Sequence, residues 1–199
     1  MTSARLRRAL ARIDEINRAD PHEIQVRGES RPKELTHAAM VSAWMERLCP
    51  DADDALRIAA HGHHVRRWTI PRREYPRGRR GYLRWRQALQ ELHAATLGEV
   101  MTEAGYHAAA IERAQDLVRK KNLRRDPDVQ ALEDALCLVF LETQLGEFRT
   151  RQPDDRVTEV LRKTWDKMSA EARALAVELD LASDDRRFLQ RVLRLGDAA

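Results

Sequence analysis

The sequence is poor in residues that cross-link, break or bend a polypeptide chain. Its 199 residues include only two cysteines, eight glycines and seven prolines. Cys49 and Cys137 lie in apolar stretches without metal-ligand spacing, so we expect reduced structural thiols of a cytosolic protein and no disulfide framework. The small number of glycines and prolines favours long helices over sheets with many turns.

Long apolar runs are also missing. The longest is ALCLVFL at residues 135–141, which is far shorter than a membrane span. The first twenty residues are rich in arginine but lack the apolar centre of a secretory signal, so we expect a helix there and no targeting peptide. These observations predict a cytoplasmic protein without a membrane-spanning segment.

Three motifs of common enzyme classes are absent. The sequence contains no glycine-rich phosphate loop, no nucleophile elbow and no cysteine–histidine pair in a catalytic arrangement. These absences argue against P-loop chemistry and against covalent catalysis. Glu34 and His37 have the E-x-x-H spacing of a di-iron bundle, but no second such pair occurs, which argues against a ferritin-like site.

The composition is that of a soluble globular protein. Hydrophobic residues make up 43%, charged residues 34% and aromatic residues 5% of the chain. The length suits one compact domain with a single substantial core. The net charge of +4 is a mild basic excess, which alone argues only weakly for anionic partners.

Apolar residues recur at helical spacing along most of the chain, and caps and prolines mark where the helices begin and end. We predict an all-α protein of about eight helices, with no strand and no internal repeat. The expected helical segments are an N-terminal one ending before Asp20, then residues 30–50, 51–68, 81–105, 107–121, 126–148 and 154–168, a short one after Ser169, and a last one through Leu193.

Several of these helices carry a metal-competent side chain on or beside an apolar face. They are His37, the adjacent pair His63 and His64, and His93, while Asp134 directly precedes the most apolar run. Each one alone is more often a hydrogen-bonded core residue than a ligand. Four helices that each bring such a residue favour a common divalent-metal site, held rigidly among apolar neighbours. The ligand types do not distinguish Mn, Fe, Zn, Ni and Mg.

The order His37, then His63-His64, then Asp134 in LEDALCLVFLE resembles the HD-domain superfamily of metal-dependent phosphohydrolases. The resemblance covers roughly residues 34–148 and implies an all-helical bundle that binds a divalent metal through these residues. It also implies an aspartate directly after the second histidine, and this sequence has none. His93 is a candidate for the missing ligand, because some members use additional histidines; the alternative is a degenerate site without metal.

A closer resemblance extends over nearly the whole chain. The stretches RIDEINRADP, HHVRRWTIPRREYP, LEDALCLVFL and KTWDKMS are similar to a family of uncharacterised proteins that is described only as a domain of unknown function. Taken together, the two resemblances imply one HD-like helical domain over residues 1–199. Its core would be residues 31–148, with C-terminal helices at 153–195 packed on it.

Nine arginines and a single acidic residue, Glu74, lie between Arg66 and Arg86. Guanidinium groups match phosphate oxygens bidentately, so this segment is a candidate for holding a small phosphate-bearing substrate beside the metal. The alternative is a solvated basic loop. The arginines nearest to the histidines in sequence are Arg66 and Arg67, which we assign to catalysis, and Arg72 and Arg73, which we assign to binding.

Two further features bear on the chemistry of the expected site. Glu133, beside Asp134, is a candidate general base, although a solvated position suits it equally. Tyr82 and Trp85 alternate with the arginines, which permits stacking on a nucleotide or on single-stranded RNA. Aromatic residues at such positions more often close a core, so we do not favour a nucleic-acid partner from the sequence.

The leading hypothesis from the sequence is a metal-dependent phosphohydrolase that acts on a nucleotide or another small phosphate ester. A second hypothesis is an HD-like iron-dependent oxygenase, because some HD-like proteins with additional histidines use iron. A third is a non-catalytic nucleotide- or RNA-binding module with a degenerate metal site.

Overall fold

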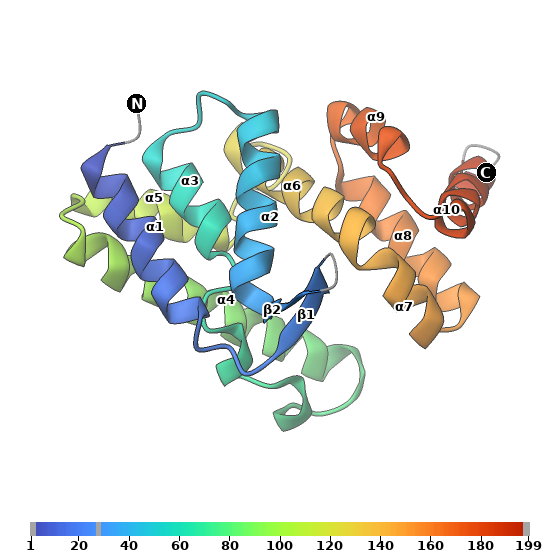
Figure 1. The fold of residues 1–199 in the computed structure, drawn as a ribbon, viewed down its shortest axis with the longest axis horizontal. Helices are drawn as coiled ribbons and strands as arrows, with labels where there is room; N and C mark the ends of the chain where they lie inside the picture. Colours follow the sequence, from blue (N-terminus) through green and yellow to red (C-terminus); the bar gives the residue numbers. More distant parts are fainter. Residues whose placement is uncertain (1–2, 27–28, 197–199) are drawn as a thin grey trace. The chain divides into compact units, whose positions relative to one another are not determined.

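The computed structural model describes residues 3–26 and 29–196, and the regular secondary structure within them is helical apart from one short hairpin (Figure 1). This confirms the predicted all-α class. The described residues form α1 Ala4–Asn17, β1 Glu23–Val26, β2 Glu29–Pro32, α2 Lys33–Leu48, α3 Asp54–Gly62, the 3-10 helices η1 Arg67–Thr69 and η2 Arg72–Glu74, α4 Gly78–Glu103, α5 Ala108–Val118, α6 Pro127–Thr143, α7 Leu145–Arg151, α8 Asp154–Lys167, α9 Ala170–Glu178 and α10 Ser183–Gly196.

The hairpin corrects the expectation that the chain has no strand. β1 and β2 pair antiparallel, with Glu23 opposite Pro32 and Val26 opposite Glu29. Most side chains of the two strands are polar, and those of β2 are exposed except for the half-buried Pro32. Polar and apolar residues alternate in β1 over only four positions and do not alternate in β2, so the signal that predicts strands from sequence is weak here.

The chain divides into two compact units, one up to Val129 and one from Gln130 onward. In the first unit, α3 is the central helix because it contacts α1, α2, α4 and α5 (Figure 1). Every residue of α3 except Asp54 and Arg57 is buried. Such a helix, buried on nearly all sides, gives its C-terminal end a fixed position inside the unit.

Polar groups from outside the helices fix where α2 and α3 begin. The Asp53 side chain caps α3 by accepting a hydrogen bond from Leu56 N at 2.8 Å. Pro32, at the start of α2, provides no side-chain cap. The buried Asp20 supplies one from a distance, because its Oδ2 accepts a hydrogen bond from Glu34 N at 3.0 Å. The first turn of α2 is therefore anchored to the segment that follows α1.

The end of α3 differs from the prediction that its helix continues to Trp68. The helix ends at Gly62, and His63 and His64 lie in the turn that follows. A Cβ atom on Gly62 would lie 2.3 Å from Leu97 Cδ2, so glycine permits the close approach of α3 to α4. Arg66 then adopts a left-handed conformation with φ 57°, which redirects the chain into η1.

The second unit contains most of α6 together with α7–α10, and α8 contacts α7 and α10. The apolar run of α6 is buried nearly all round, as its sequence predicts. Arg149 forms an ion pair with Asp185 and places its guanidinium 4.5 Å from the centre of the Phe188 ring, which ties α7 to α10. Within the part of the chain that is described, no helix is both long and apolar enough to cross a membrane.

Candidate metal centre

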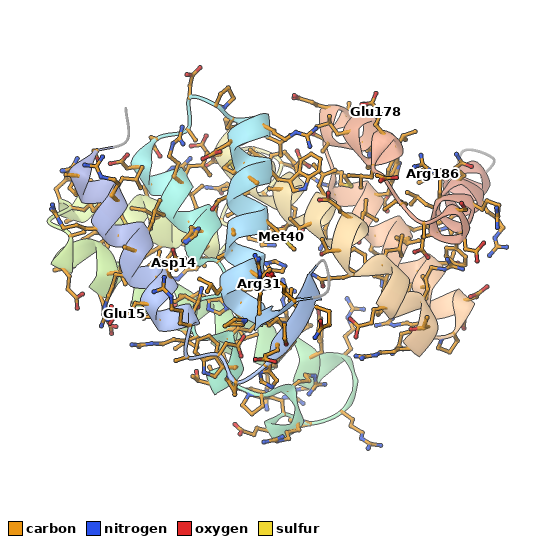
Figure 2. All side chains as sticks on the ribbon, in the orientation of Figure 1. Asp14, Glu15, Arg31, Met40, Glu178 and Arg186 are labelled. Carbon is orange, nitrogen blue, oxygen red and sulfur yellow. The ribbon has the colours of Figure 1, made fainter. Side chains whose placement is uncertain are left out.

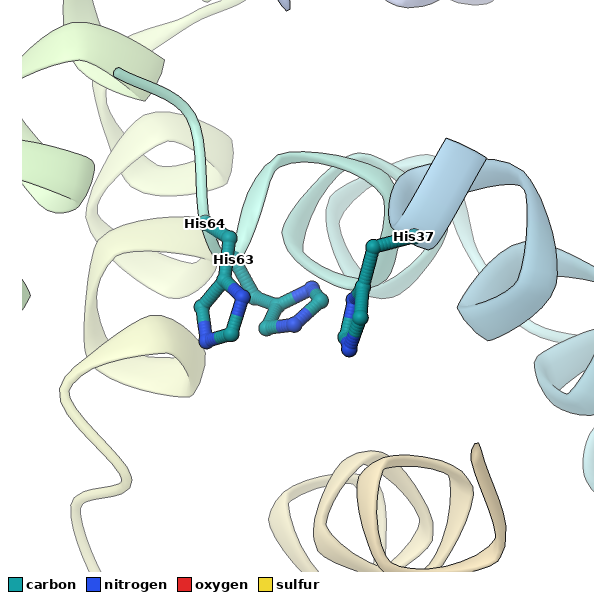
Figure 3. A group of neighbouring side chains, drawn as sticks. All are labelled: His37, His63 and His64. Carbon is teal, nitrogen blue, oxygen red and sulfur yellow. The ribbon is translucent and has the colours of Figure 1, made fainter. Parts of the chain in front are cut away.

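Three of the predicted ligands meet in the first unit. His37 comes from α2, and His63 and His64 come from the turn after α3, with their rings turned toward one another (Figure 3). The ring centres are 4.1 Å apart for His63 and His64, 4.9 Å for His37 and His64, and 5.1 Å for His37 and His63. One nitrogen from each ring lies within 4.8 Å of the other two.

His93 from α4 lies at the edge of this group. We call the four residues His37, His63, His64 and His93 the histidine cluster. The ring centre of His93 is 5.9 Å from that of His64, and its side chain is buried. Its Nδ1 lies 2.7 Å from the carbonyl oxygen of Val65, a residue of the turn that carries His63 and His64. This hydrogen bond joins α4 to that turn.

Backbone contacts select the tautomers of two rings. His63 Nδ1 donates to Ala60 O at 2.8 Å, and His93 Nδ1 donates to Val65 O. In a neutral imidazole the other nitrogen, Nε2, then carries a lone pair. Metal-binding histidines commonly have this arrangement, in which one ring nitrogen is bonded to a carbonyl and the other faces the metal.

The free nitrogens of the cluster have no hydrogen-bond partner within residues 3–26 and 29–196. They are His37 Nδ1, His63 Nε2 and His93 Nε2, and all three are buried. A buried polar atom without a partner is destabilising by roughly 1–3 kcal/mol. A divalent metal is a ligand that would satisfy several such lone pairs together, so the residues present fit a metal.

Burial keeps the imidazoles of the histidine cluster neutral. Burial lowers the pKa of His37 and of His93 to about 4. Burial, together with neighbouring positive groups, lowers the pKa of His63 and of His64 well below the usual value. At neutral pH the rings are therefore deprotonated, which is the form that binds metals.

Glu34 supplies a carboxylate to the cluster. Its Oε2 lies 3.1 Å from His64 Nδ1, and its Oε1 lies 3.8 Å from Arg67 Nε. Burial raises the pKa of Glu34 to about 7. A carboxylate hydrogen-bonded to a ligand histidine fixes the ring orientation and increases its basicity.

Arg67 lies beside His64 at the edge of the cluster. Its Nη1 is 3.5 Å from His64 Nε2, and its guanidinium is 4.9 Å from the centre of the Trp85 ring. Trp85 is itself held by a hydrogen bond from its Nε1 to Ile70 O at 2.8 Å. The guanidinium is thus fixed between an aromatic face and the carboxylate of Glu34, next to the histidines.

His61 does not belong to the histidine cluster, although it lies in the same sequence stretch. Its Nδ1 lies 2.8 Å from Ser42 Oγ, and its Nε2 lies 2.7 Å from Asp14 Oδ1. Asp14 is on the side of α1 that faces α3 (Figure 2). These contacts make His61 a link between α1, α2 and α3, and its ring is not among the three that place their nitrogens close together.

The predicted acidic residues belong to the second unit. Asp134 Oδ1 accepts hydrogen bonds from Ser169 N at 2.9 Å and from Gln130 Nε2 at 3.0 Å, so this buried carboxylate holds the start of α9 near α6. Glu133 is buried and lies 3.3 Å from Lys167 Nζ. Metal binding by Asp134 and base catalysis by Glu133 remain predictions.

The four predicted arginines, Arg66, Arg67, Arg72 and Arg73, lie in different surroundings, and only one of them contacts the histidine cluster. Arg67 adjoins the histidine cluster, whereas Arg66 lies 3.7 Å from Glu99. Arg72 donates to the carbonyl oxygens of Tyr75 and Pro76, which braces the loop before α4. Arg73 is exposed. Arg67 is therefore the arginine best placed to meet an anion at the cluster.

Sequence reasoning did not assign Glu34 to the site. The available signal is its position three residues before His37, which places both side chains on one face of α2. In the sequence, this E-x-x-H spacing is typical of a di-iron motif and does not predict a contact between Glu34 and His64. That Glu34 contacts His64, thirty residues later, depends on how α2 packs on α3.

The chain belongs to the protein family described as Domain of unknown function (DUF4202), whose model matches residues 7–188. The family match confirms the near full-length resemblance seen in the sequence. Comparison with curated proteins and with solved structures gave no significant match.

Proposed function

We propose that the protein is a metal-dependent hydrolase of phosphate esters whose divalent metal is held by His37, His63 and His64. One observation carries this proposal: three imidazoles from two separate elements place a nitrogen each within 4.8 Å of one another, and burial keeps them neutral. His93, whose ring lies beside that of His64, is the candidate for a further ligand. A tetrahedral site with metal–nitrogen distances of about 2.0 Å needs nitrogens about 3.3 Å apart, so a small inward movement of the rings completes it.

The resemblance to the HD superfamily supports the choice of reaction. We take His37 and His63 as counterparts of its first two histidines, with His64 where the superfamily has an aspartate; the other alignment, with His64 as the second histidine and Val65 after it, lacks the aspartate as well. Replacing that aspartate by an imidazole removes the carboxylate that bridges two metals in two-metal members. We therefore propose a single metal ion per chain.

The residues around the cluster suit a phosphoryl substrate. A bound divalent metal lowers the pKa of its water and polarises a phosphoryl oxygen. Arg67, fixed by Trp85 and Glu34, would neutralise one phosphate charge. Glu34 holds His64 in place and, with its pKa of about 7, can accept a proton at neutral pH.

A second function, an iron-dependent oxygenase, is favoured by the nitrogen-rich donor set. The three grouped imidazoles, with the free Nε2 of His93 beside them, are neutral donors that suit iron as well as zinc or nickel. In this case the protein purified without oxygen would contain iron and would consume oxygen with a reducing co-substrate. It would not hydrolyse phosphate esters.

Metal analysis and a hydrolysis assay test the proposal together. We expect about one divalent metal per chain after purification, and hydrolysis of p-nitrophenyl phosphate or bis(p-nitrophenyl) phosphate that chelation abolishes and metal restores. His37→Ala and His63→Ala should each lose the metal. Circular dichroism of the metal-free variants separates loss of ligands from loss of the fold.

His107→Asn provides the matched control. The His107 side chain caps α5 by accepting from Ala110 N, and asparagine is an equally good cap. This variant should retain the metal and the hydrolysis. Absence of metal from the wild-type protein even after incubation with Zn²⁺, Ni²⁺, Fe²⁺ and Mn²⁺ would overturn the proposal.

A further inference from the structure

An arginine-rich surface lies between the histidine cluster and the middle of α4. We define the arginine surface as six residues, of which the first five are exposed and the last is half-buried: Arg73, Arg77, Arg79, Arg80, Arg84 and Arg86. The one acidic residue in this stretch is Glu74. The segment, drawn in teal to green, runs along the lower edge of the view in Figure 1.

These arginines do not stabilise the unit by pairing with acids. Among the described residues none of the six forms an ion pair, whereas Arg12, Arg113 and Arg119 each pair with at least one carboxylate. Several also lie at the start of α4, where the helix dipole is positive, and the first turn of α4 contains no acidic residue. Mutual repulsion and the dipole both oppose this arrangement, so a negatively charged partner would stabilise it.

Exposed aromatic and apolar side chains accompany the charges. Tyr82 is 43% exposed, and its ring centre lies 5.9 Å from that of Trp85. Leu83 is 54% exposed on the same turn. Exposed rings between arginines are how proteins stack the bases of single strands while they neutralise the backbone phosphates.

We infer that the arginine surface binds single-stranded nucleic acid through its phosphates, with a base stacked on Tyr82. A membrane surface fits less well, because an interfacial helix presents a broad apolar face and this segment exposes only Tyr82 and Leu83. The positive charges of this surface are guanidinium groups and not ammonium groups. A guanidinium group binds phosphate oxygens bidentately and also stacks on aromatic bases.

The bound strand would lead to the histidine cluster. The Trp85 ring lies 5.9 Å from the Tyr82 ring and 4.9 Å from the Arg67 guanidinium, and Arg67 adjoins His64. Resting on the proposed function, we infer that the substrate is an oligonucleotide rather than a mononucleotide. Binding of the strand itself needs no metal, so the two proposals can fail separately.

Fluorescence anisotropy with a labelled oligouridylate of about 16 nucleotides tests the inference. The triple variant Arg79→Gln/Arg80→Gln/Arg84→Gln should bind at least tenfold more weakly than wild type at about 100 mM salt. Its log–log salt slope should fall by about 2, because each phosphate that an arginine no longer neutralises lowers the slope by about 0.7. Tyr82→Ala should weaken binding roughly fivefold to a hundredfold.

A second triple variant, Arg151→Gln/Arg156→Gln/Arg187→Gln, is the matched control. It removes the same charge from exposed positions that pair with neighbouring carboxylates in the second unit. We expect its affinity to change less than twofold, within the range of non-specific effects of net charge. Equal weakening by both triple variants would show that only net charge matters and would overturn the inference.

Two more measurements distinguish the remaining outcomes. Binding of anionic phosphatidylserine vesicles that depends on the same arginines, without binding of RNA, would assign the surface to a membrane and overturn the inference. His37→Ala should retain RNA binding; if it does while metal and hydrolysis are absent from the wild type, the proposed function fails and the inference on binding stands. Hydrolysis of p-nitrophenyl phosphate without any RNA binding would support the proposed function and overturn the inference on binding.

Discussion

Glu34 and the histidines next to it respond to protons in opposite ways. Burial lowers the pKa of His37 and His93 to about 4, so the folded protein resists their protonation. The same burial raises the pKa of Glu34 to about 7, so the folded protein favours its protonation. Four histidines have a lowered pKa and one carboxylate beside them has a raised pKa. The histidines therefore determine how the free energy of unfolding changes in mild acid.

The free energy of unfolding of the metal-free protein should decrease as the pH falls from about 6.5 to about 4. Unfolded histidines take up protons in this range while the folded ones do not, so their contribution is complete above pH 6.5 and is lost below it. Glu34 opposes this partly, because its contribution is present below about pH 4.5 and is lost as the pH rises toward 7. Urea denaturation across this range measures the sum.

Replacing His93 tests the assignment of this pH dependence. His93→Asn keeps a donor for Val65 O but removes one titrating group. Between pH 6.5 and 4 the dependence of the unfolding free energy should become shallower by up to about 1.4 kcal/mol per pH unit. An unchanged slope would mean that His93 titrates alike in the folded and the unfolded chain.

Glu34→Gln should weaken metal binding by roughly tenfold to a hundredfold, since the carboxylate partner of a ligand histidine sets its orientation and basicity. Isothermal titration with Zn²⁺ measures the change. Glu46→Gln, an exposed position on the same helix, is the control and should bind like the wild type. An affinity of Glu34→Gln equal to that of the control would show that Glu34 does not support the site.

At the scale of elements, the sequence predicted the long amphipathic helices and the histidines on their buried faces. His37, Val41, Trp44 and Met45 share the buried face of α2, as their spacing indicates. The end of α3 and the hairpin were not predictable in this way. Helix α3 stops where packing against α4 and the left-handed Arg66 redirect the chain, and both depend on contacts between distant segments.

The sequence shows the residues of single helices but not the contacts between distant segments, and this decided how much of the site could be predicted. The residue types and the helices that carry them are visible in the sequence, so His37, His63, His64 and His93 could be named. The turn that brings His63 and His64 together, and the contact of Glu34 with His64, arise from packing of α2 on α3. Hydrophobic periodicity contains no information on such contacts.

Gly62→Ala should decrease the free energy of unfolding by about 1–2 kcal/mol. Its Cβ would lie 2.3 Å from Leu97 Cδ2, and overpacking of a core is destabilising by about 1–3 kcal/mol, offset by less than about 1 kcal/mol of helix propensity. In a Leu97→Ala background the same substitution should be neutral or stabilising, because the clash is removed. Equal destabilisation in both backgrounds would exclude this explanation. Chemical denaturation of the four proteins measures the cycle.

At the scale of the whole molecule, the family match spans residues 7–188 and therefore includes parts of both units. The interpretation of one HD-like domain predicts that both units unfold together. Their tryptophans can report on this separately, because Trp44, Trp68 and Trp85 lie in the first unit and Trp165 lies in the second.

Metal at about a hundredfold excess over its dissociation constant should stabilise the protein by about 2.7 kcal/mol, or raise the unfolding temperature by roughly 5–10 °C. If the chain is one cooperative domain, a variant with Trp165 as its only tryptophan should report the same shift as a Trp165→Phe variant. Chelation should reverse the shift. A shift confined to the tryptophans of the first unit would contradict the prediction of one domain.

Helix α6 has a consequence for how this protein can be divided. The helix starts at Pro127, and the boundary between the units follows Val129, so the boundary falls inside the first turn of α6. A chain cut there would leave the N-terminal fragment with a remnant of α6 too short to form a helix, and would remove the first turn of α6 from the C-terminal fragment. Expression of the second unit by itself therefore needs to begin before Pro127, so that the first turn of α6 is kept with the rest of the helix.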